Sequence, residues 1–191
     1  MRFFWFILWL FPFAAWGQVD HKDPGVNPPA SGMSVYQLNS HWTDAYGRDI
    51  YLKDLEGGPR LIVMLYTRCQ SACPLIIEDM KGIVASLPEA QRSKLSISLF
   101  SIDSENETTE TLRQFAETRK LGTNWRLFRS GKSEVSTLAA ALGFRYKRLG
   151  NNEYVHSNVI YLLNGRGEII AHKEGFETSR ADFAKMILSR L

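Results

Sequence analysis

Two cysteines lie four residues apart in the segment Tyr66–Pro74, which reads Tyr-Thr-Arg-Cys-Gln-Ser-Ala-Cys-Pro. A helical turn brings residues at this spacing to one side, so Cys69 and Cys73 are expected to hold their sulfurs together. Pro74 suits the first position of a helix, with Cys73 as its capping residue. The positive end of a helix lowers thiol pKa values and favours the thiolate, which binds metals and attacks disulfides.

The chemistry of the cysteine pair leaves several interpretations open. The two thiols permit a reversible disulfide, two sulfur ligands for one metal ion, or an inert structural disulfide, and the first two are compatible. The pair follows the continuous apolar run Arg60–Tyr66, which predicts a strand covered on both faces. Open α/β sheets place their sites at the carboxyl ends of strands, and this favours a functional interpretation.

Strand and helix patterns alternate along the rest of the chain. Strands are predicted at 35–38, 49–52, 60–66, 95–102, 127–128, 159–163 and 168–171, and helices at 74–87, 108–117, 133–142 and 179–191. Ser104 and Glu107 are spaced as a capping box that would open the second helix. The predicted order is a hairpin, strands joined by helices, a second hairpin and a final helix. This order predicts a central mixed sheet with helices on both faces. The thioredoxin-like fold, an α/β three-layer sandwich, fits this order.

Two thiolates rarely complete a metal site, so a histidine is the expected third ligand. His21 lies in a proline-rich arm, His41 in the first hairpin, and His172 after the last strand, whereas His156 comes just before the strand 159–163. In a thioredoxin-like sheet the loop entering that strand lies beside the cysteine turn, so His156 is the best candidate. Two sulfurs and one imidazole suit copper, above all Cu(I).

Asp103 follows the strand 95–102 and is expected at the same edge of the sheet as the cysteine turn. It could support the metal ligands or contact a partner protein. Its carboxylate could equally complement the amino-terminal end of the next helix. Both interpretations remain open from the residues alone.

The amino-terminal segment indicates export from the cytoplasm. Residues 1–17 join Arg2 to a short apolar run and end in Ala15-Trp16-Gly17, the pattern of a signal peptide or an uncleaved membrane anchor. Residues 18–34 are rich in proline and glycine and predict a linker, which leaves 35–191 as one domain. The net charge of +3 in 191 residues gives no electrostatic footprint for nucleic acid.

The set of candidate residues resembles the Sco/SenC family of copper chaperones. The segment from Tyr66 to Pro74 is similar to the family's cysteine motif. Residues 101–105 are similar to its Ser-x-Asp-Pro-Glu segment, and His156-Ser157 is similar to its ligand-histidine segment. Gln70 and Ser71 replace the proline and aspartate usual between the cysteines, Ser104 replaces the proline after the aspartate, and Val155 replaces the aspartate before the histidine.

The resemblance implies that Cys69, Cys73 and His156 bind one copper ion, as Cu(I) or Cu(II). It also implies delivery to the copper-site subunit of cytochrome c oxidase, or to another copper protein, in the periplasm or at the outer face of the inner membrane. The alternative is a thiol–disulfide oxidoreductase that reduces that copper site, or a redox sensor. The last proline is Pro88, so no proline near His156 can face the cysteines as in thioredoxin-type enzymes. This favours a metal carrier over an enzyme of general dithiol exchange. A thiol peroxidase is the third possibility.

Overall fold

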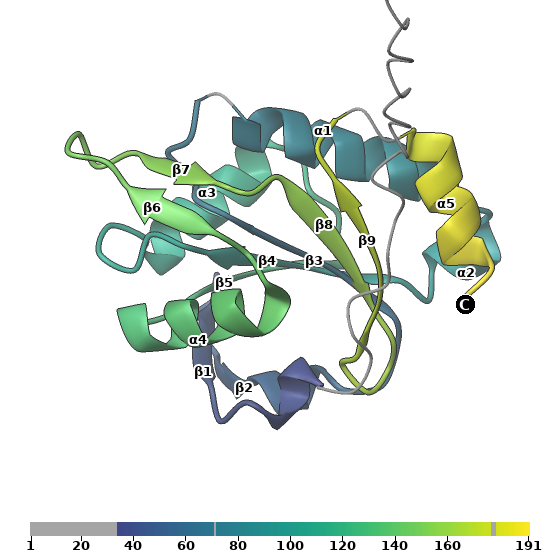
Figure 1. The fold of residues 1–191 in the computed structure, drawn as a ribbon, viewed down its shortest axis with the longest axis horizontal. Coiled ribbons are helices and arrows are strands. Elements are labelled where there is room, and N and C mark those ends of the chain that lie inside the picture. Colours follow the sequence, from purple (N-terminus) through teal and green to yellow (C-terminus); the bar gives the residue numbers. More distant parts are fainter. Residues whose placement is uncertain (1–33, 71, 177–178) are drawn as a thin grey trace, which may run out of the picture.

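The computed structural model describes residues 34–70, 72–176 and 179–191 (Figure 1). The sequence predictions for residues 1–17, for most of the linker at 18–34, and for His21 lie outside these residues. Two 3₁₀ helices, five α-helices and nine strands follow in the described chain: η1 (Val35–Gln37), β1 (His41–Asp44), β2 (Asp49–Tyr51), η2 (Leu52–Leu55), β3 (Arg60–Leu65), α1 (Ala72–Ala85), α2 (Glu89–Arg92), β4 (Ser96–Ser101), α3 (Thr109–Thr118), β5 (Trp125–Arg129), α4 (Lys132–Leu142), β6 (Tyr146–Arg148), β7 (Tyr154–His156), β8 (Val159–Leu163), β9 (Ile169–Glu174) and α5 (Arg180–Leu188).

Seven of these strands form one mixed sheet in the order β2-β1-β5-β4-β3-β8-β9. Strands β3, β4 and β5 run parallel, and antiparallel strands flank them on both sides. Every residue of β3 is buried, as its continuous apolar run predicts for a central strand covered on both faces. The predicted central mixed sheet is therefore confirmed.

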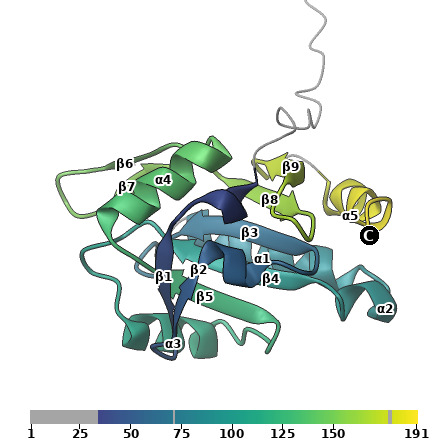
Figure 2. The same cartoon turned by 90° about the horizontal axis from the view of Figure 1, so that it is seen from below.

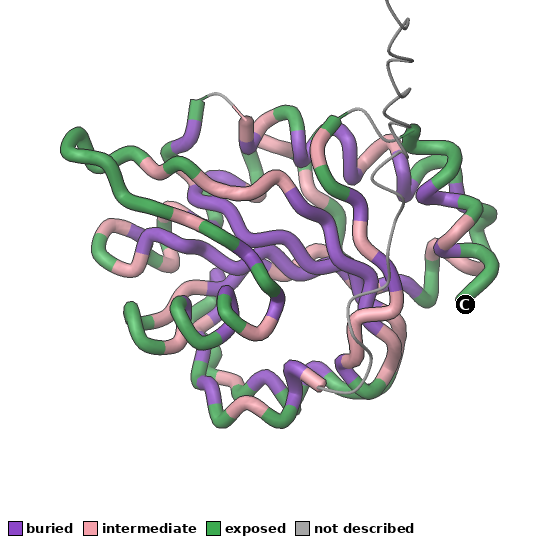
Figure 3. The backbone as a smooth tube through the Cα atoms, viewed as in Figure 1, coloured by how far each residue is buried: buried purple, intermediate pink, exposed green. Residues whose placement is uncertain are grey.

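Helices cover both faces of this sheet. Helix α1 packs against α5 on one face, and α4 lies on the opposite face near η1 (Figures 1 and 2). The buried residues concentrate on the sheet strands and on the helix sides that face them (Figure 3). At the α1–α5 side, the buried Asp79 accepts from Lys173 Nζ at 2.8 Å and from Arg180 Nε at 2.7 Å, which links α1, β9 and α5.

The N-terminal hairpin forms, but its first strand is not the predicted one. Strand β1 pairs antiparallel with β2, whereas residues 35–37 form the 3₁₀ helix η1. The Ser34 hydroxyl accepts from Tyr36 N at 3.1 Å and caps this short helix, which buries Val35 and Tyr36. The apolar residues that suggested a strand are thus buried by a helical turn instead.

The starts of two helices also differ from the predictions. Helix α1 begins at Ala72, so Cys73 and Pro74 lie inside its first turn rather than at the cap and the first position. Helix α3 is capped by Thr108, whose hydroxyl accepts from Thr111 N, and the predicted capping box of Ser104 and Glu107 is wrong. The buried Glu107 carboxylate accepts instead from Thr67 and Ser101, and from the Thr111 hydroxyl in the first turn of α3 at 2.8 Å.

A second, two-stranded sheet was not predicted. Strands β6 and β7 pair antiparallel and form a hairpin that lies beyond the end of the main sheet (Figure 1). His156 is the last residue of β7, so the segment predicted as a loop is part of this hairpin. Within the described residues, no helix has both the length and the apolar character needed to cross a bilayer.

Candidate metal centre

The cysteine turn follows the carboxyl end of β3 and leads into α1. The Cys69 amide donates to Tyr66 O at 3.3 Å, and the Cys73 amide donates to Cys69 Sγ at 3.4 Å. Cys69 is 5% exposed and Cys73 is fully buried, and the two are not joined by a disulfide. The turn and the first helical turn therefore hold both sulfurs on one side, as their spacing predicted.

Glu107 anchors this turn to the neighbouring strand. Its carboxylate accepts from the Thr67 amide at 3.1 Å, from the Thr67 hydroxyl at 2.6 Å and from the Ser101 hydroxyl at 2.7 Å. Hydrogen bonds to a buried carboxylate are stronger than those between neutral groups. Glu107 thus fixes the backbone two residues before Cys69, a role that the capping-box pattern in the sequence concealed.

His156 reaches the sulfurs from the β6–β7 hairpin. Its Nδ1 lies 2.9 Å from Ser157 O, and because a carbonyl only accepts, Nδ1 carries the proton and donates. The Nε2 lone pair is then left facing Cys73 Sγ at 3.5 Å. The ring also stacks on Phe144 at 5.9 Å and meets Tyr66 edge-on at 6.1 Å between centroids. These contacts orient the imidazole with Nε2 toward the thiols.

The three side chains predicted from the sequence come together. One ligand atom from each of Cys69, Cys73 and His156 lies within 4.8 Å of the other two. With metal–sulfur and metal–nitrogen bonds of about 2.3 and 2.0 Å, a planar three-ligand site has its sulfur and nitrogen about 3.7 Å apart. The observed 3.5 Å between Cys73 Sγ and His156 Nε2 is close to this value. The donor set and its spacing therefore fit one soft metal ion.

The protonation of Cys73 differs from the expectation of lowered thiol pKa values at the helix end. The hydrogen bond with the Cys69 side chain, followed by burial, raises the pKa of the Cys73 thiol well above its ordinary value. The helix terminus does not offset these two effects. Cys73 is therefore a thiol in the metal-free protein, and a bound cation would have to displace its proton.

Asp103 lies close to the cysteine turn, and one of its partners, Arg68, belongs to that turn. It is 1% exposed, forms an ion pair with Arg68, and accepts from Asn106 Nδ2 at 2.8 Å and from the Tyr154 hydroxyl at 3.3 Å. Burial acts to raise the pKa of Asp103, but the hydrogen bonds from Arg68 and Asn106 outweigh it and lower that pKa. Asp103 is thus an anionic anchor beside the site.

Two tyrosines connect the hairpin to the body of the protein, and sequence reasoning missed both. The Tyr154 amide donates to the Tyr66 hydroxyl at 3.3 Å, and the two rings meet edge-on at 5.1 Å. Burial, with the nearby Asp103 carboxylate, raises the pKa of Tyr154 to about 12, so its hydroxyl stays a donor at neutral pH. Because Tyr154 is two residues from His156, these contacts help to set the position of the imidazole.

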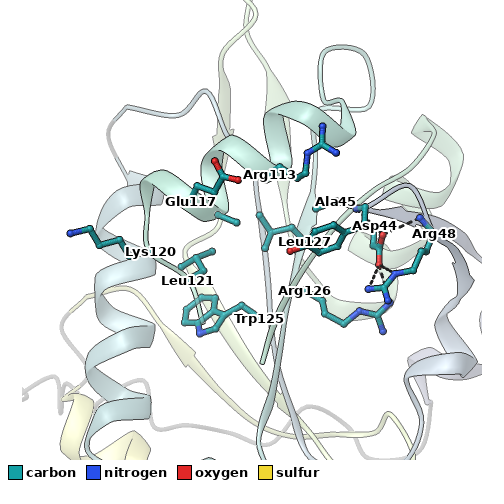
Figure 4. A pocket seen from close by; sticks show the side chains of 12 residues that line it. Asp44, Ala45, Arg48, Arg113, Glu117, Lys120, Leu121, Trp125, Arg126 and Leu127 are labelled. Atoms are coloured by element: carbon teal, nitrogen blue, oxygen red, sulfur yellow. Dashed lines mark hydrogen bonds and ion pairs between the residues drawn. The ribbon is translucent and has the colours of Figure 1, made fainter. Parts of the chain in front are cut away.

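The other described histidines lie apart from this cluster. His41 Nε2 is 3.9 Å from an Asp49 carboxylate oxygen in the first hairpin, and His172 on β9 contacts the ring of Tyr161 on β8. A separate hollow of about 180 Å³ lies between the β1–β2 turn, α3 and β5 (Figure 4). There the Asp44 carboxylate accepts from Arg48 and Arg126, and no cysteine or histidine is among the lining residues.

The fold and the Cys-Cys-His cluster together define a thioredoxin-like protein with a candidate soft-metal site. A sequence model of the SCO1/SenC family matches residues 32–190, and the chain belongs to this family. The SCO1 protein homolog of Bacillus subtilis (strain 168) is 25% identical over 140 residues, which cover 71% of this chain and 72% of that protein.

Solved structures have the same fold. One of them is BsSco, which is described as a member of the Sco family of cytochrome c oxidase assembly proteins with an identified disulfide switch. It superposes on this chain with a TM-score of 0.67 at 24% identity, and the match covers 80% of this chain and 94% of BsSco. ScoI of Bradyrhizobium japonicum with copper bound gives a TM-score of 0.68 at 19% identity, covering 80% and 97%. The predicted thioredoxin-like class is confirmed.

Proposed function

We propose that this protein is a copper chaperone that binds one copper ion through Cys69, Cys73 and His156. The observation that carries the proposal is the convergence of two sulfurs and one imidazole nitrogen within 4.8 Å, from segments 83 residues apart. Soft sulfur ligands select Cu(I) over harder cations. The copper bound to related Sco structures supports the same metal here.

The number of ligands suits a carrier. Three protein ligands leave a copper ion open to attack by a ligand from another protein, whereas a closed four-ligand site would hold it. The two cysteines are buried and His156 is half-buried, so the imidazole is the more accessible ligand. Release would begin by exchange of His156 for a ligand of the recipient, while both sulfurs still hold the ion.

Metal analysis tests the binding step. Purified, reduced protein exposed to Cu(I) is expected to retain one copper per chain, and Cys69→Ser and Cys73→Ser are each expected to lose most of it. Retention of copper by both cysteine variants would contradict the proposed site. Zinc titrated in parallel is expected to bind more weakly, because only three ligands are offered.

We further propose that the recipient is the copper-site subunit of cytochrome c oxidase. Family membership and the description of BsSco as an oxidase assembly protein support this choice. Copper-loaded protein would be mixed with the metal-free copper domain of the oxidase subunit, and the absorption of the assembled copper centre followed. If copper passes to a small chelator but never to this domain, the proposed recipient is wrong.

A thiol–disulfide role for the same cysteines is the second candidate function. The two sulfurs lie within 4.8 Å of each other, so a disulfide between them requires only that they approach to about 2.05 Å. In this role the dithiol reduces an oxidised cysteine pair on the recipient and becomes a disulfide itself. Reduction of an oxidised oxidase-site peptide by metal-free protein, at a rate that Cys69→Ser abolishes, would support this role.

We also propose export with a membrane tether or a cleaved signal peptide. The apolar segment at residues 1–17 supports this, as does the linker composition at 18–34 before the domain at 35–191. Expression with fractionation should place the protein in the periplasm or on the outer face of the inner membrane. A protein that stays in the cytoplasmic fraction would contradict the proposal.

A further inference from the structure

The β6–β7 hairpin carries a solvent-facing patch directly beside the candidate copper ligand. A hollow of about 360 Å³ lies there, lined by Arg145, Tyr146, Lys147, Val155, His156, Ser157 and Glu174. Because His156 lines this hollow, a molecule seated in it touches a candidate copper ligand. Neither cysteine is among the residues that line this hollow.

The strand register separates the hairpin into two faces. Tyr146 pairs with His156, and Lys147 pairs with Val155. Side chains of paired residues share a face, and successive residues alternate, so Lys147 and Val155 lie on the face opposite the imidazole. Arg145 and Ser157 continue this outer face, since Ser157 N donates to Arg145 O at 2.8 Å. We call Arg145, Lys147 and Val155 the hairpin patch.

The charges of the hairpin patch are available to a partner. Arg145 and Lys147 are exposed, and within the described residues neither side chain forms an ion pair or a hydrogen bond. The neighbouring cations are engaged, since Arg148 pairs with Glu105 at 2.6 Å and Arg68 pairs with Asp103. Glu174 also lines the hollow, so the two cations leave an excess of one positive charge.

The patch combines these cations with an exposed apolar side chain. Val155 is 61% exposed, pairs with Lys147 across the hairpin and directly precedes His156 in the chain. Protein interfaces typically have an apolar centre with a polar or charged rim. A patch of this kind suits a partner that docks against the hairpin carrying His156, a residue that also lines the hollow.

We propose that the hairpin patch docks a partner protein whose own metal-binding residues are surrounded by carboxylates. This inference rests on the proposed function, because it names the surface by which the copper is handed over. Carboxylates on the partner would pair with Arg145 and Lys147, and an apolar side chain would cover Val155. Electrostatic attraction of this kind acts mainly on the rate of encounter and is screened by salt.

Two synthetic acceptor peptides test the docking surface. Both contain the same two cysteines and one histidine, flanked by four glutamates in one peptide and four lysines in the other. Copper-loaded protein should transfer Cu(I) to the glutamate peptide about tenfold faster at low ionic strength. The difference should shrink to about twofold in 0.3 M salt, where charges are screened within a few ångströms.

Arg145→Glu/Lys147→Glu is expected to reverse the peptide preference. The matched control is Lys53→Glu/Lys94→Glu, which changes the net charge equally with exposed lysines. These lysines precede β3 and β4, so they lie at the opposite end of the parallel strands from the cysteine turn. The control variant should keep the preference for the glutamate peptide. If wild type transfers copper equally fast to both peptides, or if the two double variants have equal effects, the hairpin patch is not the docking surface.

Two further measurements separate this inference from the proposed function. Competition with a chromogenic Cu(I) chelator should give the same copper affinity for wild type and Arg145→Glu/Lys147→Glu. If wild type itself binds no copper, the proposed carrier function is wrong, but the docking surface is not yet tested. Binding of fluorescent peptides to metal-free protein then still measures the patch by anisotropy. Loss of binding to phosphatidylglycerol vesicles in the hairpin variant, with no peptide preference in wild type, would assign the patch to a membrane and refute a protein partner.

Discussion

Replacement of His156 by alanine tests whether the hairpin completes the metal site. The substitution removes the nitrogen that lies 3.5 Å from Cys73 Sγ and leaves both sulfurs in place. Loss of a group that only supports a metal ligand costs about 10–100-fold in affinity, and loss of a ligand belongs at the upper end of this range. We therefore expect Cu(I) affinity to fall about 100-fold, which corresponds to about 2.7 kcal/mol.

The folded protein should survive this substitution. His156 contributes ring contacts with Phe144 and Tyr66, and such contacts are worth about 0.5–1.5 kcal/mol each. The expected decrease in the free energy of unfolding is about 1–3 kcal/mol, against the 5–15 kcal/mol typical of a domain. Urea unfolding of the metal-free variant checks this, so that a loss of copper is not mistaken for a loss of structure.

The assay is anaerobic competition for Cu(I) between the reduced protein and a chromogenic chelator. His172→Ala is the matched control, because His172 is also half-buried and contacts an aromatic ring but lies outside the cluster. This control should keep the affinity of wild type within about twofold, as expected for a residue that contacts neither the ligands nor their supports. If His156→Ala binds Cu(I) as tightly as His172→Ala, the three-ligand site is wrong.

Three further predictions concern the groups around the site and the core. Tyr154→Phe removes the 3.3 Å hydrogen bond to Asp103, and chelator competition should show Cu(I) affinity about three- to tenfold lower, because the hairpin that carries His156 is less firmly held. Lys173→Met removes one of the two cations paired with the buried Asp79, so urea unfolding should show a loss of about 2 kcal/mol, with partial recovery when Asp79 is also replaced by leucine. The pKa of Asp103 is lowered in the folded protein, so its stabilising effect is complete above the pKa of an unfolded aspartate, about 4, and is lost as the pH falls through the folded value. Unfolding measured at pH 7 and pH 3 should therefore show a smaller acid-induced loss for Asp103→Asn than for wild type; an equal loss would assign the acid sensitivity to other carboxylates.

Local sequence patterns were sufficient for the sulfur half of the site. The apolar run before Cys69 predicts a buried strand, and the four-residue spacing to Cys73 predicts two sulfurs on one side of a turn. Both features depend on periodicity and turn geometry within about a dozen residues, so they can be read before any long-range contact is known. The same reasoning fails at the exact helix start, because Ala72 rather than Pro74 begins α1.

The position of the imidazole and of its supports was decided by tertiary structure. His156 was selected by an argument about the fold, but the hairpin that carries it was not predicted, since β6 and β7 are each only three residues long. Glu107 and Tyr154 hold the cysteine turn and the hairpin through partners 40 and 51 residues away, respectively. Contacts between such distant segments leave no periodic signal in the chain. The sequence by itself therefore determined which atoms could bind a soft metal, whereas packing between distant segments determined that they meet.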